Sequence, residues 1–143
     1  PLPMGNVLTV QLRRTLAHEL NHAARITVGP GYGRTLLDTI VSEGIADDFA
    51  TSVYPRSLAP WTHALTPSEM HHYWRAAQPH LYEILQHRPY VQWMFGGGRF
   101  PHWTGYTLGA ALVASAQNQR PTPWSRFTRQ TADQILSASR FSP

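Results

Sequence analysis

Two histidines four residues apart carry the clearest chemical signal in this sequence. The segment His18-Glu19-Leu20-Asn21-His22 places both imidazoles on one face of a helix, about 6 Å apart along its axis. Two ring nitrogens at that spacing can bind one metal ion at about 2.0–2.1 Å. Glu19 lies at the edge of the same face, where its carboxylate can take a proton from a water molecule on the metal. The motif predicts a hydrolytic metal centre with His18 and His22 as ligands and Glu19 as general base.

A second helix is expected to supply the third ligand. The run Leu36–Val53 has apolar residues at spacings of three and four, which is typical of a helix, and it contains Glu43. Asp47 follows Glu43 by four residues, so it shares that face and could orient a ligand histidine through the other ring nitrogen. Two histidines, one glutamate and an open position are typical of a catalytic zinc site. We therefore expect one zinc ion per chain, the alternative being two helices with ordinary solvated polar faces.

Hydrolysis at such a centre also needs a donor for the negative charge that develops on the substrate oxygen. Tyr106, beside Gly105 at the start of an expected helix, is one candidate. His102, four residues earlier, is the other, and the sequence leaves the choice between the two open.

The rest of the pattern predicts a mainly α-helical protein, with all 143 residues in one domain. Thr66, Pro67 and Glu69 form the start signal of a helix that contains Pro79 and is expected to bend near Gln78. The stretch from Arg88 to His102, which has three consecutive glycines, is expected to be a flexible loop. The helices are expected over Val7–Val28, Leu36–Val53, Pro67–His87 and Thr104–Gln119, with one or two short ones ending near Ser139.

Composition excludes several classes of protein. The net charge of +4 comes from twelve arginines scattered along the chain, without the basic stripe that a nucleic-acid-binding surface would show. No apolar run is long enough to span a membrane. The chain has no cysteine, which removes disulfides and thiolate zinc ligands.

The motifs together resemble a known group of enzymes. His-Glu-x-x-His followed by a Ser-Glu-Gly helix is similar to the gluzincins, zinc metallopeptidases whose third ligand is a glutamate. More narrowly, the chain resembles a bacterial family of predicted zinc-dependent proteases that is filed as a domain of unknown function. The matching segments lie at 60–66, 93–96, 101–109 and 131–139, the third of them reading Pro-His-Trp-Thr-Gly-Tyr-Thr-Leu-Gly.

This resemblance implies a zincin-like helical core that contains an active-site helix and a glutamate helix. It also implies a metallopeptidase that hydrolyses peptide bonds in peptide or protein substrates through a zinc-bound water activated by Glu19. Two other functions stay open: hydrolysis of a non-peptide amide or ester, and metal binding by a regulatory or interaction protein without turnover.

One part of the gluzincin pattern has no counterpart here. Gluzincins carry a small sheet before the first metal helix, and the six residues before Val7 are too few to form one. We expect this sheet to be absent, or to lie upstream in a longer precursor of which this chain is the C-terminal part. The start at Pro1 rather than Met indicates a trimmed chain. Cytoplasmic and secreted locations both stay open, and so does the oligomeric state.

Overall fold

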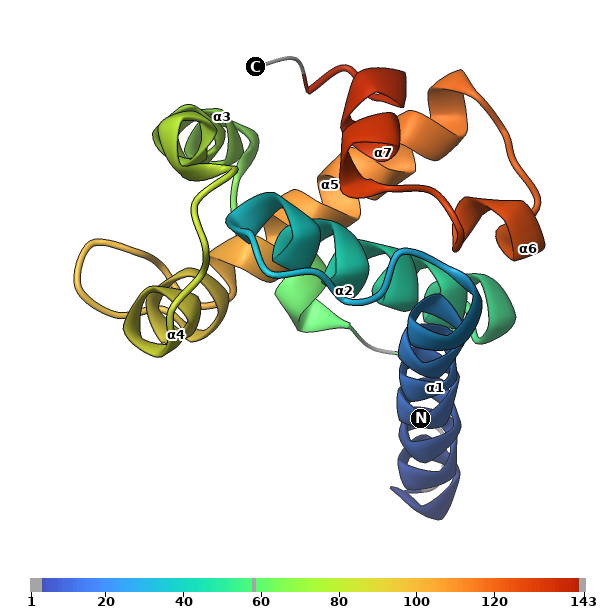
Figure 1. Ribbon diagram of the computed structural model, residues 1–143. Helices are drawn as coiled ribbons and strands as arrows, with labels where there is room; N and C mark the ends of the chain where they lie inside the picture. The colour runs from blue at the N-terminus through green and yellow to red at the C-terminus, as the bar shows by residue number, and fades with distance from the viewer. Residues whose placement is uncertain (1–3, 58, 142–143) are drawn as a thin grey trace.

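The protein is mainly α-helical, as the sequence predicts. A computed structural model describes residues 4–57 and 59–141 (Figure 1). These residues form no β-strand and only two isolated bridges, Thr35 with Ile84 and Gly97 with Phe100. The helices are α1 (Met4–Val28), α2 (Leu36–Val53), η1 (Pro60–His63), α3 (Pro67–Ala77), η2 (Gln78–His80), α4 (His87–Phe95), α5 (Thr104–Gln119), α6 (Trp124–Phe127) and α7 (Ala132–Ala138). No helix in these two ranges is both long and apolar enough to cross a bilayer.

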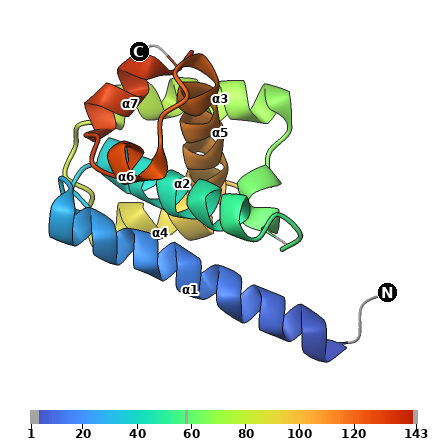
Figure 2. The same cartoon turned by 90° about the vertical axis from the view of Figure 1, so that its right-hand side faces the viewer.

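Helix α2 is the centre of the core. It begins at a capping box between Thr35 and Asp38 and is apolar or small on nearly every face. Helices α1, α5 and α7 pack around it, which leaves most of its length without solvent contact (Figures 1 and 2). A helix buried on all sides holds its side chains in fixed positions, so a polar residue on α2 is placed accurately.

Helices α2 and α5 cross with their backbones in direct contact. A Cβ atom added at Gly44 would lie 2.3 Å from the carbonyl oxygen of Gly109. One added at Gly109 would lie 2.0 Å from the carbonyl oxygen of Ile40. Both separations are far below the contact distance of two atoms, so only glycine fits at the crossing. This crossing lies next to Glu43 and thereby fixes its distance from α5.

Helix α1 packs on α2 with a polar face. Arg14 and Arg25 are only 2% and 1% exposed, and Asn21 is also buried. Arg25 donates hydrogen bonds to Ser42 Oγ (3.1 Å) and to the carbonyl oxygens of Thr128 (3.0 Å) and Gln130 (2.8 Å). Hydrogen bonds and an ion pair, rather than apolar packing alone, therefore attach this helix to the core.

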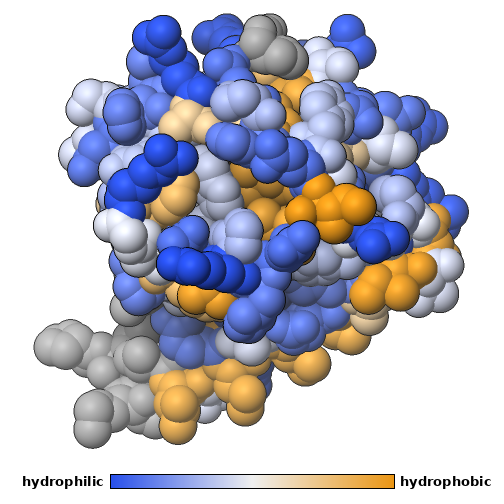
Figure 3. All heavy atoms as spheres, turned by 60° about the vertical axis from the view of Figure 1, so that its left-hand side comes forward, coloured by the Kyte–Doolittle hydropathy of each residue, from blue (hydrophilic) through white to orange (hydrophobic). Residues whose placement is uncertain are grey.

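The outer face of α1 is apolar and exposed. Figure 3 shows a row of apolar side chains along the lower edge of the molecule. Four leucines at intervals of four residues make up this leucine strip, and they are 58–73% exposed: Leu8, Leu12, Leu16 and Leu20. The strip leads into an open apolar groove of about 460 Å³ between α1, the end of α2 and α6.

The expected boundaries of the third helix and of the following loop were wrong. Helix α3 begins at the predicted Thr66–Glu69 capping box but ends at Ala77, and one 3₁₀ turn containing Pro79 follows it. Helix α4 then occupies the first half of the stretch expected to be a loop. Pro89 is tolerated there because it lies in the first turn, where its missing N–H has no partner to lose. Trp93 and Met94 bury the inner face of α4, and this packing stabilises a helix that the neighbouring prolines and glycines concealed.

The residues before Val7, which were expected to be too few for a sheet, are described only in part. Helix α1 begins at Met4 rather than at Val7, so residues 4–6 are helical. Residues 1–3 lie outside the described part of the chain. The two terminal helices, α6 and α7, agree with the prediction, and α7 ends at Ala138.

Candidate metal centre

Helices α1 and α2 bring together three side chains that can bind one metal ion. His18 Nε2 lies 2.9 Å from His22 Nε2 and 3.4 Å from Glu43 Oε2. His22 Nε2 lies 3.5 Å from Glu43 Oε1. Ligand atoms about 2.1 Å from a tetrahedral zinc ion lie about 3.4 Å from one another. The donor types and their separations therefore fit a zinc ion, and among the described residues this is the group that could hold a metal.

Glu43 is a buried carboxylate with three hydrogen-bonding neighbours. Tyr32, on the turn between α1 and α2, donates from its hydroxyl to Glu43 Oε1 at 2.5 Å. Burial alone would raise the pKa of Glu43, but hydrogen bonds from His18, His22 and Tyr32 outweigh it and lower the pKa to about 2. Glu43 is therefore ionised at neutral pH, as a metal ligand must be.

His18 lies between two carboxylates. Its Nδ1 is 3.2 Å from Asp47 Oδ1, while its Nε2 faces Glu43. Burial works against the protonated form, but hydrogen bonds to Asp47 and Glu43, together with their charges, outweigh burial and raise the pKa of His18 to about 9. Asp47 thus lies where the sequence predicted a partner for a ligand histidine, and the histidine it contacts is His18.

Asp47 is itself held from two further sides. Arg14 donates to its Oδ1 at 2.7 Å, and the indole N–H of Trp61 donates to its Oδ2 at 2.8 Å. The Arg14 guanidinium also lies over the Trp61 ring, 4.9 Å from its centroid. A carboxylate with donors on both oxygens cannot rotate freely, so it presents a fixed acceptor to His18. No hydrogen-bond partner supports the other ligand histidine in this way, because within the described ranges the buried Nδ1 of His22 has none.

The three residues predicted to act on the substrate lie in different settings. Glu19 is exposed on α1. Tyr106, on α5, is half-buried; burial and then the negative charge of Glu43 raise the pKa of its phenol, with a smaller contribution from Glu19. It is therefore a protonated donor within electrostatic range of both glutamates. His102 is exposed and packs against Trp103, with ring centroids 4.5 Å apart.

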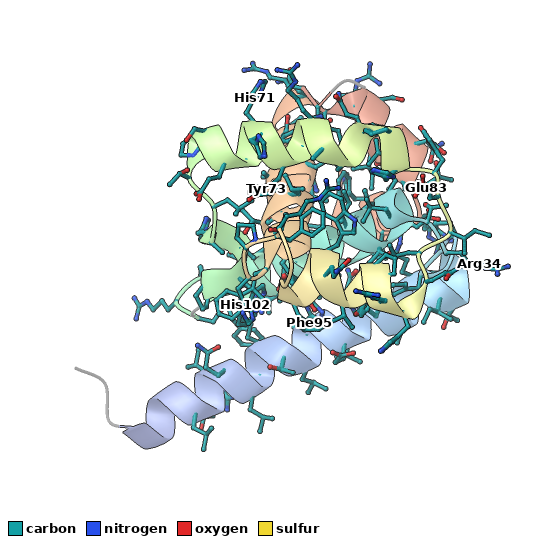
Figure 4. The ribbon with its side chains drawn as sticks, turned by 90° about the vertical axis from the view of Figure 1, so that its left-hand side faces the viewer. Arg34, His71, Tyr73, Glu83, Phe95 and His102 are labelled. Atoms are coloured by element: carbon teal, nitrogen blue, oxygen red, sulfur yellow. The ribbon has the colours of Figure 1, made fainter. Side chains whose placement is uncertain are left out.

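The side of the molecule that carries α4 adds an aromatic surface. Figure 4 shows Phe95 and His102 on this side, with α4 lying above α1. The Phe95 ring is 6.0 Å from the rings of both Tyr90 and Tyr106. Burial and then the negative charge of Glu43 raise the pKa of the Tyr90 phenol, so this aromatic group lies within electrostatic range of the metal centre.

Sequence reasoning missed four residues of this site. Arg14 could have been found, because it precedes His18 by four residues and so lies on the same face of α1. Tyr32 carries a weaker signal, a tyrosine between two glycines. Trp61 and Tyr90 reach the site from separate helices, and no spacing in the sequence indicates their contacts.

Comparison with known proteins agrees with this geometry. Residues 5–137 match the family described as "Predicted Zn-dependent protease (DUF2268)". The chain is also 32% identical over 102 residues to the uncharacterized protein YjaZ of Bacillus subtilis (strain 168), an alignment that covers 68% of this chain and 39% of YjaZ. The chain thus spans well under half the length of that relative. No solved structure matches the chain. Since the family match covers nearly all of the sequence, the chain belongs to this family of predicted Zn-dependent proteases.

Proposed function

We propose that the protein is a zinc-dependent hydrolase that cleaves peptide bonds. The observation that carries this proposal is the convergence of His18 Nε2, His22 Nε2 and a Glu43 carboxylate oxygen, with Glu19 one residue from the first ligand. Three protein ligands leave a fourth position open, which a catalytic zinc site needs and a structural site lacks. The family description supports a peptide as the substrate.

Each residue of the centre has a distinct task in this proposal. Zinc bound at the site would polarise the substrate carbonyl and lower the pKa of water. Glu19 is the general base: its exposed carboxylate takes the proton from the attacking water and later gives it to the leaving amine. Asp47 keeps the His18 ring in one orientation and accepts from its Nδ1, so that Nε2 stays free for the metal.

We assign the oxyanion donor to Tyr106 rather than to His102. A donor to developing negative charge must be protonated and partly shielded from water. Tyr106 meets both conditions and lies within electrostatic range of Glu19 and Glu43. The His102 ring is instead exposed and packs on Trp103, with ring centroids 4.5 Å apart, so it lacks the shielding from water.

The proposal is tested by comparing the parent protein with Glu19→Gln. Zinc content of each is measured together with cleavage of a broad peptide library and of small amides and esters. We expect about one zinc per chain in both proteins, and cleavage that falls by a factor of about 10²–10⁴ in Glu19→Gln. Glu83→Gln is the control, since Glu83 is an exposed glutamate paired with His80.

Three outcomes would contradict the proposal. Zinc that does not bind the parent protein, or that binds equally well after His18→Ala, would remove the metal centre. Zinc bound without any cleavage would favour a binding or regulatory protein. Cleavage confined to small amides or esters would favour the non-peptide alternative.

A further inference from the structure

The two carboxylate oxygens of Glu43 have different surroundings. Oε2 faces His18 Nε2 at 3.4 Å, and within the described residues the hydroxyl that bonds to Glu43 is on the other oxygen. Oε1 lies 3.5 Å from His22 Nε2 and also accepts the 2.5 Å hydrogen bond from the Tyr32 hydroxyl. Such a short bond to an ionised carboxylate is of the strong, charge-assisted kind. It withdraws electron density from Oε1 and leaves Oε2 as the better ligand atom.

We propose that Tyr32 restricts Glu43 to a single ligand oxygen and thereby keeps one coordination position of the zinc site open. This inference rests on the proposed function, because it assumes that the three residues bind zinc. Without the Tyr32 hydroxyl, both oxygens of Glu43 are equivalent donors and can bind the metal together. A bidentate carboxylate would occupy the position that water and substrate need.

Tyr32 is placed for this task by the same helices that carry the ligands. Its carbonyl oxygen accepts a hydrogen bond of 2.8 Å from Ser42 Oγ, on the residue before Glu43. Ser42 Oγ accepts in turn from Arg25 Nε of α1 at 3.1 Å. The backbone of Tyr32 is thus tied to α2 and, through Arg25, to α1, so the hydroxyl cannot drift from Glu43 while both helices are in place.

The turn that carries Tyr32 needs its two neighbouring glycines. Gly31 and Gly33 have φ values of +82° and +87°, in the region that other residues rarely adopt. These two conformations turn the chain back so that the phenol points between α1 and α2. The Tyr32 ring lies 5.3 Å from the His22 ring. Tyr32 is therefore a positioning residue, which acts on the metal through Glu43.

Cobalt(II) substituted for zinc gives a readout that does not depend on activity. Its visible absorption is stronger at four-coordinate than at five-coordinate sites, because ligand number and geometry determine the spectrum. We expect the parent protein to give an intense spectrum and Tyr32→Phe to give one several-fold weaker. We also expect zinc affinity, measured by competition with a chromophoric chelator, to rise in Tyr32→Phe, because Glu43 would then offer two ligand oxygens in place of one.

Tyr82→Phe is the matched control. Tyr82 also donates to a carboxylate, Asp133 Oδ1 at 2.9 Å, but it lies on an exposed surface away from the ligands. This variant should keep the parent spectrum and affinity. Tyr32→Met, which also lacks the hydroxyl but has a different shape, should reproduce the effect of Tyr32→Phe and so separates the lost hydrogen bond from altered packing.

The outcomes distinguish this inference from the function on which it rests. An unchanged cobalt spectrum and unchanged zinc affinity in both Tyr32 variants would overturn the role of Tyr32 and leave the metal centre standing. A weaker spectrum in Tyr82→Phe as well would show that the effect is not specific to Tyr32 and would also overturn it. Failure of cobalt and zinc to bind the parent protein would overturn the proposed function, and this inference with it.

Discussion

His18 is the residue of the metal centre that contacts two carboxylates. It contacts Asp47 through Nδ1 and Glu43 through Nε2, and in the metal-free protein it carries a proton because its pKa is raised to about 9. Nε2 is also the atom that must bind the metal. A proton and a metal ion therefore compete for the same nitrogen.

This competition predicts that zinc binds more tightly as pH rises. Between pH 6 and 8 the His18 proton, with a pKa of about 9, must be released before zinc binds. Each unit of pH should then raise the apparent affinity about tenfold. Glu43, with a pKa of about 2, is ionised throughout this range and adds no slope. Chelator competition at several pH values measures the effect, and an affinity independent of pH would contradict it.

Asp47→Asn is the informative variant in that titration. Asparagine has nearly the same shape but removes a negative charge that favours protonated His18. The pKa of His18 should fall, so the slope should become shallower near the top of the range. An unchanged slope would mean that Glu43 alone holds the proton on His18.

Residues one or more helical turns apart could be predicted from the sequence because helix geometry fixes their relation. His18 with His22, and Glu43 with Asp47, each lie four residues apart, and each pair shares a face in the structure. The contact of Tyr32 with Glu43 could not be predicted in this way. It depends on the path of a glycine-containing turn, and that path is determined by tertiary hydrogen bonds such as the one from Ser42.

At the scale of the elements, the metal centre depends on how closely α2 and α5 approach. The contact of Gly44 with Gly109 brings two backbones together beside a ligand residue. Helix α2 was predicted correctly from its apolar spacing, and α5, which is rich in small residues, has the expected bounds, Thr104–Gln119. Their crossing was not predicted, because a glycine in a helical pattern can equally mark an end or a weak point.

Gly109→Ala should separate the two helices and destabilise the protein. Alanine is favoured over glycine inside a helix by up to about 1 kcal/mol. The added Cβ would nevertheless lie 2.0 Å from the Ile40 carbonyl oxygen. That oxygen is part of the α2 backbone, so it cannot move aside without moving the helix. We expect a net loss of about 1–3 kcal/mol in the free energy of unfolding, measured by urea denaturation.

The control for this change lies at the exposed end of α5. Asn118→Ala should alter the free energy of unfolding by no more than about 0.5 kcal/mol. Equal stability of Gly109→Ala and the parent protein would contradict the close crossing. A zinc affinity that falls with stability in Gly109→Ala would indicate that the crossing also positions Glu43.

The wrong boundary predicted for α3 and the missed helix α4 have a common physical cause. Prolines and glycines between residues 79 and 98 favour breaks in local structure, and the prediction followed that local preference. Burial of Trp93 and Met94 against the core outweighs it over nine residues. Tertiary packing of this kind leaves little trace in a short segment, which explains why α4 was missed.

At the scale of the whole molecule, α1 separates two surfaces of opposite character. The face toward the core is polar and buried, while the leucine strip on the other face is apolar and exposed. This arrangement is the reverse of a usual surface helix, in which the apolar side faces the core. The strip, rather than the core, should therefore dominate contact with apolar dyes and matrices.

Two leucine substitutions test this reversed arrangement. Leu12→Ala removes an exposed side chain and should change the free energy of unfolding by no more than about 0.5 kcal/mol, while weakening retention on a hydrophobic-interaction column. Leu112→Ala removes a fully buried side chain from α5 and should cost about 2–5 kcal/mol with little change in retention. Similar losses of stability in both variants would mean that another part of the molecule covers the strip.

The polar face of α1 also has a directional consequence. Apolar packing tolerates small rotations of a helix, whereas hydrogen bonds depend on angle. A slip of one residue turns a helix by about 100° and would take Arg14, Asn21 and Arg25 away from their partners together. The rotational setting of α1 is therefore fixed at both ends of the motif, by Arg14 about one turn before His18 and by Arg25 about one turn after His22.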